Sequence, residues 1–313
     1  MVISEQKTNF GLLEELQAVN ALNIKEGVRA ARYTTYAIGG MIPVLLEPES
    51  RQALVRTVAV LKKWKYPWQI LGAGSNLLVS EGALNFAVIR LGREFRYVRS
   101  LNSNTIEVGA AASLMSLSRR VSSNGLSGLE FAGGIPGSVG GAVRMNAGAH
   151  GGQMSDVLEQ VDILTSDLNF ESLSARELEF GYRKVSIAQD AIILGGTLRL
   201  IESDPQTCLK KRTECLAYRK ATQPLTLPSA GSVFRNPQDG PTAGELIEAC
   251  GLKGLSRGGA QISEKHANWI VNPERKASYE DVVFLINKCR SEVLSRYGIE
   301  LLTEIVKWQR VRD

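Results

Sequence analysis

The sequence predicts an α+β protein of two closely packed domains, and three observations lead to this prediction. Candidate strands stand in neighbouring runs instead of alternating one by one with helices, which favours α+β over a parallel α/β sheet. The chain has 313 residues, a length suited to two domains or one large one. Pro205 separates the last run of strands from a helical segment, and no low-complexity linker joins the parts. We therefore expect domains of about 200 and 110 residues that pack together.

The first domain is expected over residues 31–204, after an N-terminal helix or arm over residues 1–30. In that arm an apolar stripe recurs at helical spacing, formed by Leu12, Leu13, Leu16 and Val19. Ser50 is suited to cap a helix over 51–65, and Gly125 to end a helix that begins near residue 113. Short apolar runs predict strands over 42–48, 68–71, 86–91, 97–100 and 105–111.

Three more strand segments follow a glycine-rich stretch and predict an antiparallel meander over 160–166, 169–180 and 191–201. The second domain, 205–313, is expected to begin with a helix over 206–222 and a loop rich in proline and serine. Ser278 and Asp281 form a capping-box pattern at the start of the strongest helix, whose buried stripe is Val282, Leu285, Ile286, Cys289 and Val293. The last strand is predicted over 299–308.

Composition excludes several classes of protein. Hydrophobic residues make up 44% of the chain and the formal net charge is +5, which rules out disordered, collagen-like and coiled-coil classes. No stretch approaches the roughly 18 apolar residues of a membrane span and no leader pattern opens the chain, so we expect a cytoplasmic protein without a membrane partner. Four cysteines without a C-x-x-C pair and only two histidines predict no metal site. Dispersed lysines and arginines favour an anionic small molecule over nucleic acid.

Two glycine-rich segments are candidates for binding an anion. The segment 128–152 holds nine glycines in 25 positions, and such a segment lets backbone N–H groups approach a pyrophosphate. The turn Gly72–Asn76 follows a strand and adds Ser75 and Asn76 as donors. Leu77 stands where a dinucleotide fingerprint needs its third glycine, and the chain has no P-loop motif, so neither standard nucleotide fold is expected. Plain tight turns are the alternative.

Polar residues in three other segments are candidates for chemistry. Ser232 lies in a glycine- and proline-bounded loop, where it is either a proton donor or a turn serine. Glu304 stands among the apolar residues Leu302, Ile305 and Trp308, so it is either an acid with a raised pKa or an outward-facing strand residue. The remaining candidates are clamps for a carboxylate or phosphate and ligands for polar groups: Tyr182, Arg183, Arg219, His150 and His266.

Taken together, these segments resemble the UDP-N-acetylenolpyruvoylglucosamine reductases (UDP-N-acetylmuramate dehydrogenases, MurB), flavoenzymes of bacterial peptidoglycan synthesis. The resemblance runs from about Arg32 to Trp308 and matches the shorter type of the family. Its motifs, in order, are TTYAIGG at 34–40, LGAGSNLLV at 71–79, the segment 128–152, FGYRKVS at 180–186, AGSVFRNP at 230–237, AGELIEACGLKG at 243–254, HANWIVN at 266–272 and LLTEI at 301–305.

The resemblance implies a two-lobed FAD-binding domain of the vanillyl-alcohol-oxidase type, followed by a smaller α+β substrate-binding domain. It implies non-covalent FAD, NADPH as the hydride donor and a UDP-sugar as the second substrate. We also expect a monomer. Hydride would pass through the flavin N5 to the enolpyruvyl group. The residues that it places at the cofactor are Gly72, Ala73, Gly74, Ser75, Asn76, Leu77, Gly133, Gly134, Ile135, Pro136, Gly137, Ser138, Gly140, Gly141, Ala147 and Gly148.

The resemblance also assigns catalytic and substrate residues. Ser232 matches the proton donor, Arg183 the guanidinium at the substrate carboxylate, and Glu304 the acid that assists at the enol. Hydride addition to the enolpyruvyl double bond builds up negative charge that such groups would stabilise. The substrate positions are Tyr182, Arg219, Asn236 and His266. The chain has Thr222 or Gln223 where the longer type has a lysine, so the diphosphate contact is expected at Arg219 or elsewhere, and the role of Arg144 stays open.

Two other classes of function remain as alternatives. Another FAD-dependent oxidoreductase of the same fold, such as an oxidase, would share the glycine segments. A non-enzymatic anion or nucleic-acid binder would account for the positive charge and for the glycines, and its binding would depend steeply on salt. The ordered motifs favour the reductase over both.

Overall fold

The structure, a computed structural model, describes residues 11–310. The chain forms two compact units. Unit 1 comprises the described residues up to Glu26 together with Val44–Gly72 and Phe86–Leu216, and unit 2 comprises Gly27–Pro43, Ala73–Asn85 and the described residues from Ala217 onward. The last crossing between the units lies inside the helix α5 (Pro205–Thr222). Pro205, where the sequence suggests a domain boundary, is the first residue of this helix. The domain ranges expected from the sequence stay a prediction.

A four-stranded sheet lies near the start of the chain, and most of its residues belong to unit 1. Its order is β1-β2-β5-β3, and β5 runs parallel to both β2 and β3. The strands are β1 (Leu22–Arg29), β2 (Met41–Pro48), β3 (Trp68–Ile70) and β5 (Ala87–Ile89). Helix α2 (Arg51–Lys63) follows β2, and the Ser50 hydroxyl accepts a hydrogen bond from Ala53 N, which confirms the predicted cap.

The N-terminal segment is only partly as predicted. Residues 11–17 are helical, and Leu12 and Leu16 are buried, as the spacing indicates. Residues 1–10 of the predicted arm lie outside the described residues. The strand β1 was not expected, because most of its side chains are exposed and the segment carries little apolar pattern.

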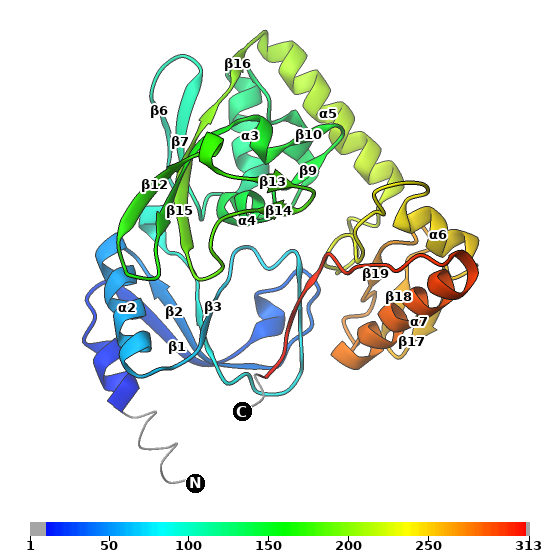
Figure 1. The fold of residues 1–313 in the computed structure, drawn as a ribbon, viewed down its shortest axis with the longest axis horizontal. Coiled ribbons are helices and arrows are strands. Elements are labelled where there is room, and N and C mark those ends of the chain that lie inside the picture. The colour runs from blue at the N-terminus through cyan, green and yellow to red at the C-terminus, as the bar shows by residue number, and fades with distance from the viewer. Residues whose placement is uncertain (1–10, 311–313) are drawn as a thin grey trace. The chain divides into compact units, whose positions relative to one another are not determined.

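A five-stranded antiparallel sheet forms the second part of unit 1, in the order β12-β11-β15-β7-β6. Figure 1 labels β6, β7, β12 and β15 of this sheet. The strands are β6 (Val98–Ser100), β7 (Thr105–Gly109), β11 (Leu158–Leu164), β12 (Phe170–Ser174) and β15 (Ile192–Arg199). The predicted meander is wrong, because the three strands do not pair in the order of the sequence. The segment between β12 and β15 is long enough to carry the chain back past β12, so β15 pairs with β11 instead.

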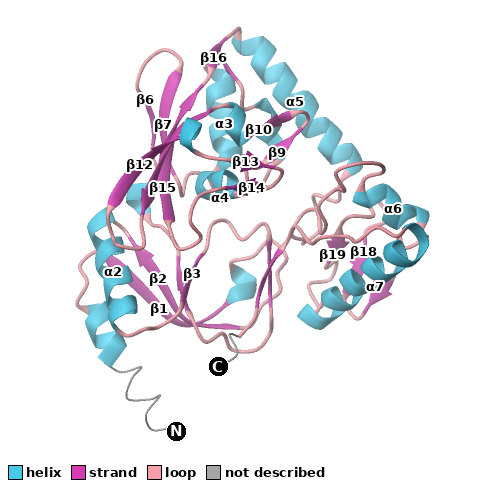
Figure 2. Cartoon of the chain, viewed as in Figure 1, coloured by secondary structure: helices cyan, strands magenta, loops and turns pink. Residues whose placement is uncertain are grey.

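The glycine-rich stretch 128–152 folds into short elements instead of an open loop (Figure 2). They are η3 (Glu130–Gly134), α4 (Val139–Arg144), β9 (Gly148–Ala149) and β10 (Gly152–Gln153). Helix α3 (Leu114–Ser123) precedes them and ends before Gly125, which has a φ of +72° as predicted for a helix stop. The other short elements of unit 1 are η2 (Arg93–Phe95), β8 (Leu126–Ser127), η4 (Met154–Asp156), η5 (Ala175–Glu177), β13 (Phe180–Gly181), β14 (Lys184–Val185) and β16 (Ile201–Glu202).

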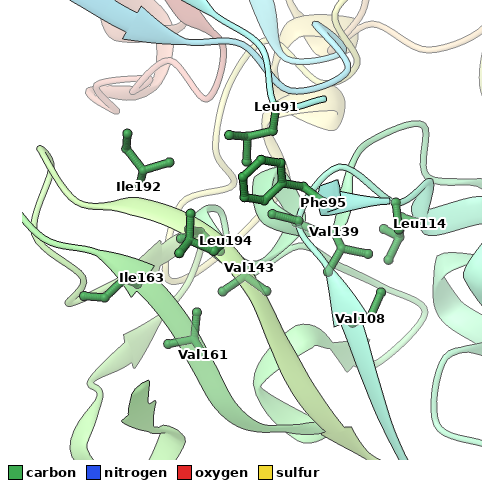
Figure 3. Close-up of a cluster of buried hydrophobic side chains, with 14 of the residues drawn as sticks. Leu91, Phe95, Val108, Leu114, Val139, Val143, Val161, Ile163, Ile192 and Leu194 are labelled. Atoms are coloured by element: carbon green, nitrogen blue, oxygen red, sulfur yellow. The ribbon is translucent and has the colours of Figure 1, made fainter. Parts of the chain in front are cut away.

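The core of unit 1 fixes α4 against the five-stranded sheet. Val139 and Val143 of α4 are buried in the same cluster as Val108 of β7 and Leu194 of β15 (Figure 3). Their neighbours in the figure are Leu91, Phe95, Leu114, Val161, Ile163 and Ile192. Burying such side chains contributes roughly 1.5–3 kcal/mol each. The apolar face of this short helix therefore sets where its N-terminus points.

Unit 2 brings distant parts of the sequence together. Strand β4 (Leu77–Val79) pairs in parallel with β20 (Val306–Trp308), and β17 (Ser256–Arg257), β18 (Ala260–Ile262) and β19 (Ile270–Val271) form an antiparallel sheet. The helices are η1 (Ala30–Arg32), α6 (Ala243–Ala249) and α7 (Tyr279–Tyr297). The predicted capping box and buried stripe of α7 are confirmed. No helix among residues 11–310 is long and apolar enough to cross a membrane.

Candidate functional site

The first group of candidate residues lies in unit 1, where the turn after β3 meets the start of α4. A Cβ atom added to Gly72 would lie 2.7 Å from Ser138 Oγ. Ser138 caps α4, because its hydroxyl accepts a hydrogen bond from Gly141 N at 3.3 Å. Only a glycine at position 72 lets the turn approach this cap so closely. The glycines of both predicted anion segments thus meet at one helix start.

The start of α4 is held in place by the chain that follows β7. Val139 N donates to Ala112 O, Gly140 N donates to Ala110 O, and Leu114 N donates to Gly137 O. A Cβ on Gly140 would lie 2.8 Å from the Cβ of Ala110. Pro136 and Gly141 are exposed, and the residues between them are half-buried or, at Val139, buried. The segment therefore presents accessible backbone next to Gly72.

Gly133 and Gly134 differ from their neighbours because they are buried in η3. The guanidinium of Arg212 from α5 donates to Gly133 O and to Ser118 Oγ, both at 3.2 Å. A Cβ on Gly133 would lie 2.7 Å from Arg212 Cγ. The absence of a side chain at Gly133 therefore allows η3 to pack closely against α5.

Tyr182 and Arg183 form the tip of the hairpin of β13 and β14, instead of ending a longer strand. Arg183 has a φ of +57°, which is costly for a side chain other than glycine. Its guanidinium lies 4.9 Å from the centre of the Tyr182 ring and donates to Gly148 O at 2.9 Å. Arg183 and Gly148, both predicted site residues, are thus brought together.

Asn146 is a residue whose role the sequence did not reveal. Its buried carboxamide donates to Gly181 O and to Gln153 Oε1, and accepts from Ser155 N. It therefore ties the hairpin that carries Arg183 to the end of the glycine-rich segment. No local sequence pattern indicates this role, because the groups that Asn146 binds belong to other turns. Its φ of +38° is a conformation that asparagine adopts more readily than most residues.

Arg144, whose role was open, is a structural clamp. Its guanidinium donates to the carbonyl oxygens of Ile187, Ala188 and Ala191 at 2.9, 2.9 and 2.6 Å. Burial lowers the pKa of this arginine. It holds the segment after β14 against α4.

The rest of the first turn, Ala73–Leu77, belongs to unit 2. Gly74 has a φ of +65°, and a Cβ there would lie 2.0 Å from Tyr33 O. Thr35 N donates to Gly74 O at 3.1 Å, so the turn lies against the 33–35 segment. Asn76 uses its side chain within the protein, because Nδ2 donates to Glu304 O at 3.2 Å.

Ser232 and Glu304 lie on two neighbouring segments of unit 2. Glu304 N donates to Val233 O at 2.8 Å, and Phe234 bridges antiparallel to Thr303. Both Ser232 and Glu304 are half-buried. Glu304 precedes β20 instead of lying within it, and of its apolar neighbours Ile305 and Trp308 are buried while Leu302 is 58% exposed. Main-chain hydrogen bonds therefore bring the segments that carry Ser232 and Glu304 side by side.

Arg219 is a buried cation with an unfilled donor. Its Nε donates to Gln223 Oε1 at 2.8 Å, while Nη1 is buried and has no hydrogen-bond partner among the described residues. Burial lowers the pKa of Arg219 to about 10, so it stays charged at neutral pH. A buried guanidinium of this kind is suited to bind an anionic group.

Asn236 and His266 are the remaining substrate candidates. Asn236 Oδ1 accepts from Ala243 N at the start of α6, so its amide Nδ2 is the group left to donate to a ligand. Burial, and then the charge of Lys253, lower the pKa of His266. Because His266 Nδ1 accepts from Asn268 N at 3.3 Å, the proton of the neutral ring lies on Nε2.

Comparison with known proteins identifies the family. Residues 223–308 match the family model described as UDP-N-acetylenolpyruvoylglucosamine reductase, C-terminal domain, and residues 42–169 match an FAD binding domain. The chain is 42% identical over 297 residues to the UDP-N-acetylenolpyruvoylglucosamine reductase of Anoxybacillus flavithermus, covering 94% of this chain and 97% of that one. The reductase of Bacillus subtilis is 40% identical with the same coverage.

A solved structure supports the same relationship. The UDP-N-acetylenolpyruvylglucosamine reductase (MurB) of Thermus caldophilus matches with a TM-score of 0.80 and 37% identity, over 92% of this chain and 100% of that one. The predicted fold class is thereby confirmed. The alternatives of an oxidase or a non-enzymatic binder are set aside, because these full-length relatives are reductases. The chain belongs to the UDP-N-acetylenolpyruvoylglucosamine reductase family.

Proposed function

We propose that this chain reduces the enolpyruvyl group of UDP-N-acetylglucosamine enolpyruvate to UDP-N-acetylmuramate, with NADPH as reductant and FAD bound in unit 1. The observation that carries the proposal is the pairing of the Ser232 and Glu304 segments, through Glu304 N and Val233 O at 2.8 Å, in a chain of this family. It supports an acid and a carboxylate acting on one substrate.

The residues of unit 1 fit the pyrophosphate of FAD. Gly72 and Gly141 have no side chain beside Ser138, and a Cβ on either would lie within 3.3 Å of its hydroxyl. Helix starts and glycine-rich backbone bind phosphate groups through N–H donors. When bound, FAD would carry the hydride from NADPH to the enolpyruvyl double bond. The proposed holding residues of unit 1 are Gly72, the 135–141 segment, Ala147 and Gly148, and the match to the family's motifs assigns Ala73–Leu77 to FAD as well.

The proposed chemistry of the protein itself is charge stabilisation and protonation. Hydride addition at the β-carbon leaves negative charge on the α-carbon and the adjoining carboxylate, and a guanidinium neutralises such charge well. Arg183 is proposed to hold the carboxylate, Ser232 Oγ to donate a proton to the α-carbon, and Glu304 to assist at the enol. Arg219 is proposed to bind the diphosphate, and Tyr182, Asn236 and His266 other polar groups of the UDP-sugar.

A serine variant tests this assignment. We expect Ser232→Ala to slow reoxidation of the reduced flavin by substrate by about 10²-fold or more, because a positioned proton donor is lost. Flavin reduction by NADPH should stay within about twofold, since it needs no proton from Ser232. Ser229→Ala, in the same loop, is the control and should leave both rates unchanged. Equal slowing of both half-reactions by Ser232→Ala would refute the role.

The location and the oligomeric state belong to the same proposal. A cytoplasmic monomer acting on small molecules is what the sequence predicts. Sedimentation of the holoenzyme would test the monomer directly.

A further inference from the structure

We propose that Asn268 is the positioning residue that sets the register between Ser232 and Glu304. The inference rests on the proposed function, since it concerns how the proposed proton donor and acid are aligned. Asn268 lies in the HANWIVN segment, where the sequence drew attention only to His266. Its side chain is 3% exposed. A buried carboxamide has to find both a donor and an acceptor partner.

Both partners of the Asn268 carboxamide come from a single residue. Phe234 N donates to Asn268 Oδ1 at 2.9 Å, and Asn268 Nδ2 donates to Phe234 O at 2.8 Å. Phe234 is itself 1% exposed, so its backbone groups cannot turn to solvent instead. The side chain of Asn268 thus takes the place of a neighbouring strand along one edge of Phe234.

The opposite edge of the same segment holds Glu304. Glu304 N donates to Val233 O at 2.8 Å, and Arg235 N donates to Leu302 O at 2.9 Å. Phe234 and Thr303 form the antiparallel bridge between these two hydrogen bonds. In such a pair the backbone groups of successive residues point to opposite sides. The Val233 carbonyl and the Arg235 N–H therefore face the Glu304 segment, while both backbone groups of Phe234 face Asn268.

The backbone around Asn268 adds a second attachment close to Ser232. Val233 N donates to Asn268 O at 2.9 Å. Asn268 N donates to His266 Nδ1, and Ser263 N donates to Trp269 O, so the 263–269 segment is itself held on both sides of Asn268. Val233, the residue after Ser232, is consequently held by Asn268 through its N–H and by Glu304 through its carbonyl oxygen.

The carboxamide of Asn268 is the group that provides this pairing. An aspartate would keep the acceptor for Phe234 N but would place a carboxylate oxygen against Phe234 O. An alanine would leave both backbone groups of Phe234 unpaired. In either case the segment is expected to move relative to Glu304 while Ser232 and Glu304 keep their own side chains. A displacement of about 1 Å at a reacting group costs about 10²-fold in rate.

The test compares Asn268 with a matched asparagine. The variants are Asn268→Asp and Asn268→Ala, and the control is Asn272→Ala. Asn272 is also buried in unit 2, where Nδ2 donates to Tyr36 O and Oδ1 accepts from Ala277 N. Its side chain makes the same type of bonds as that of Asn268, but to neither the Ser232 nor the Glu304 segment. The bond from Asn272 N to Pro228 O belongs to the backbone, which the substitution keeps. Both half-reactions of each holoenzyme are followed anaerobically, below all melting temperatures, in H₂O and in D₂O.

We expect the Asn268 variants to reoxidise with substrate about 10²-fold more slowly, with flavin reduction by NADPH within about twofold of the unsubstituted protein. The solvent isotope effect on reoxidation should rise, because proton transfer becomes slower. Asn272→Ala should lower the melting temperature and leave the ratio of the two rates unchanged. Hydrogen exchange at the Phe234 amide should be fast in Asn268→Ala and slow in the unsubstituted protein and the control.

Two results would overturn the proposal. One is an Asn268→Ala protein whose two half-reactions change together, as a general loss of stability would cause. The other is a Phe234 amide that stays protected in this variant. Failure of the proposed function itself would appear elsewhere, as unsubstituted holoenzyme that NADPH reduces and the enolpyruvyl substrate does not reoxidise.

Discussion

At the scale of single residues, Arg144 and Asn146 are polar side chains to which the sequence assigned no chemistry. Both bind backbone carbonyl oxygens. Arg144 and Asn146 both lie at the end of α4. The Arg144 side chain binds the segment after the hairpin of β13 and β14, and the Asn146 side chain binds Gly181 within that hairpin. That hairpin carries Arg183. The position of the proposed carboxylate-binding guanidinium therefore depends on two residues that need not touch the substrate.

Removing the Arg144 clamp should destabilise the protein. Arg144→Met keeps much of the side-chain length but leaves three carbonyl oxygens without their donor, so we expect the free energy of unfolding to fall by roughly 2 kcal/mol. Arg120→Met is the control, because Arg120 is exposed on α3 and should change stability by no more than about 0.5 kcal/mol. Urea unfolding measures both. Equal changes in the two variants would contradict the clamp.

The protonation of His266 predicts a pH dependence of stability. Burial lowers its pKa from the usual 6.5, so below pH 6.5 the unfolded chain binds more protons than the folded one. The contribution of His266 to the free energy of unfolding is therefore fully present above pH 6.5. It is lost as the pH falls through the lowered pKa of the folded state. We expect His266→Gln to lose less stability than the unsubstituted protein between pH 7.5 and 5.5. This is measured by urea unfolding at the two pH values.

One outcome would contradict this assignment. If His266→Gln kept the pH dependence of the unsubstituted protein, His266 would be excluded as its source.

At the scale of elements, the approach of the turn after β3 to α4 is the feature most sensitive to a single methyl group. Gly72→Ala places a Cβ 2.7 Å from Ser138 Oγ, so Ser138 must leave its capping position. We expect about 1 kcal/mol of stability to be lost with the cap, and FAD to bind about tenfold more weakly. Thermal unfolding and fluorescence titration of the apoprotein with FAD measure the two effects.

Gly82→Ala is the matched control for Gly72→Ala. A Cβ at Gly82 has no atom within 4 Å, and its backbone is not in the left-handed region. It should leave both the stability and the FAD affinity unchanged. If Gly72→Ala also left both unchanged, the contact between the turn and the cap would have no role in binding.

Elements with a strong local pattern were predictable from the sequence, and those that depend on distant partners were not. The α7 helix follows its capping box and apolar stripe, and α2 follows Ser50. The α4 helix spans only Val139–Arg144, which is too short to show a helical period. The return of β15 to β11 depends on pairing between distant strands, about which local periodicity carries no information.

The residues of the candidate site were predictable from the sequence, but the contacts that hold them were not. Motif positions identified Ser232 and Glu304, but not that main-chain bonds join their segments. Asn268 and Asn146 escaped notice because a buried asparagine is recognised by the backbone groups it binds, and these belong to residues far along the chain or in another turn.

At the scale of the whole molecule, unit 2 is assembled from three separate stretches of sequence. The strand β4 from the first third of the chain pairs with β20 from its end, and Asn76 next to β4 binds Glu304 next to β20. The proposed acid is therefore in place only when the Asn76 segment and the C-terminal segment have folded together. The net charge of +5 suits substrates that are all anionic, because it favours their approach at low ionic strength.

The most direct test of the central claim is an anaerobic stopped-flow experiment on the unsubstituted holoenzyme. NADPH should bleach the oxidised-flavin absorbance at about 450 nm, and UDP-N-acetylglucosamine enolpyruvate added next should restore it. Both phases together would establish the reductase. Bleaching without recovery would contradict the proposed substrate while leaving an FAD-dependent enzyme. A colourless protein that binds no added FAD would contradict the account as a whole.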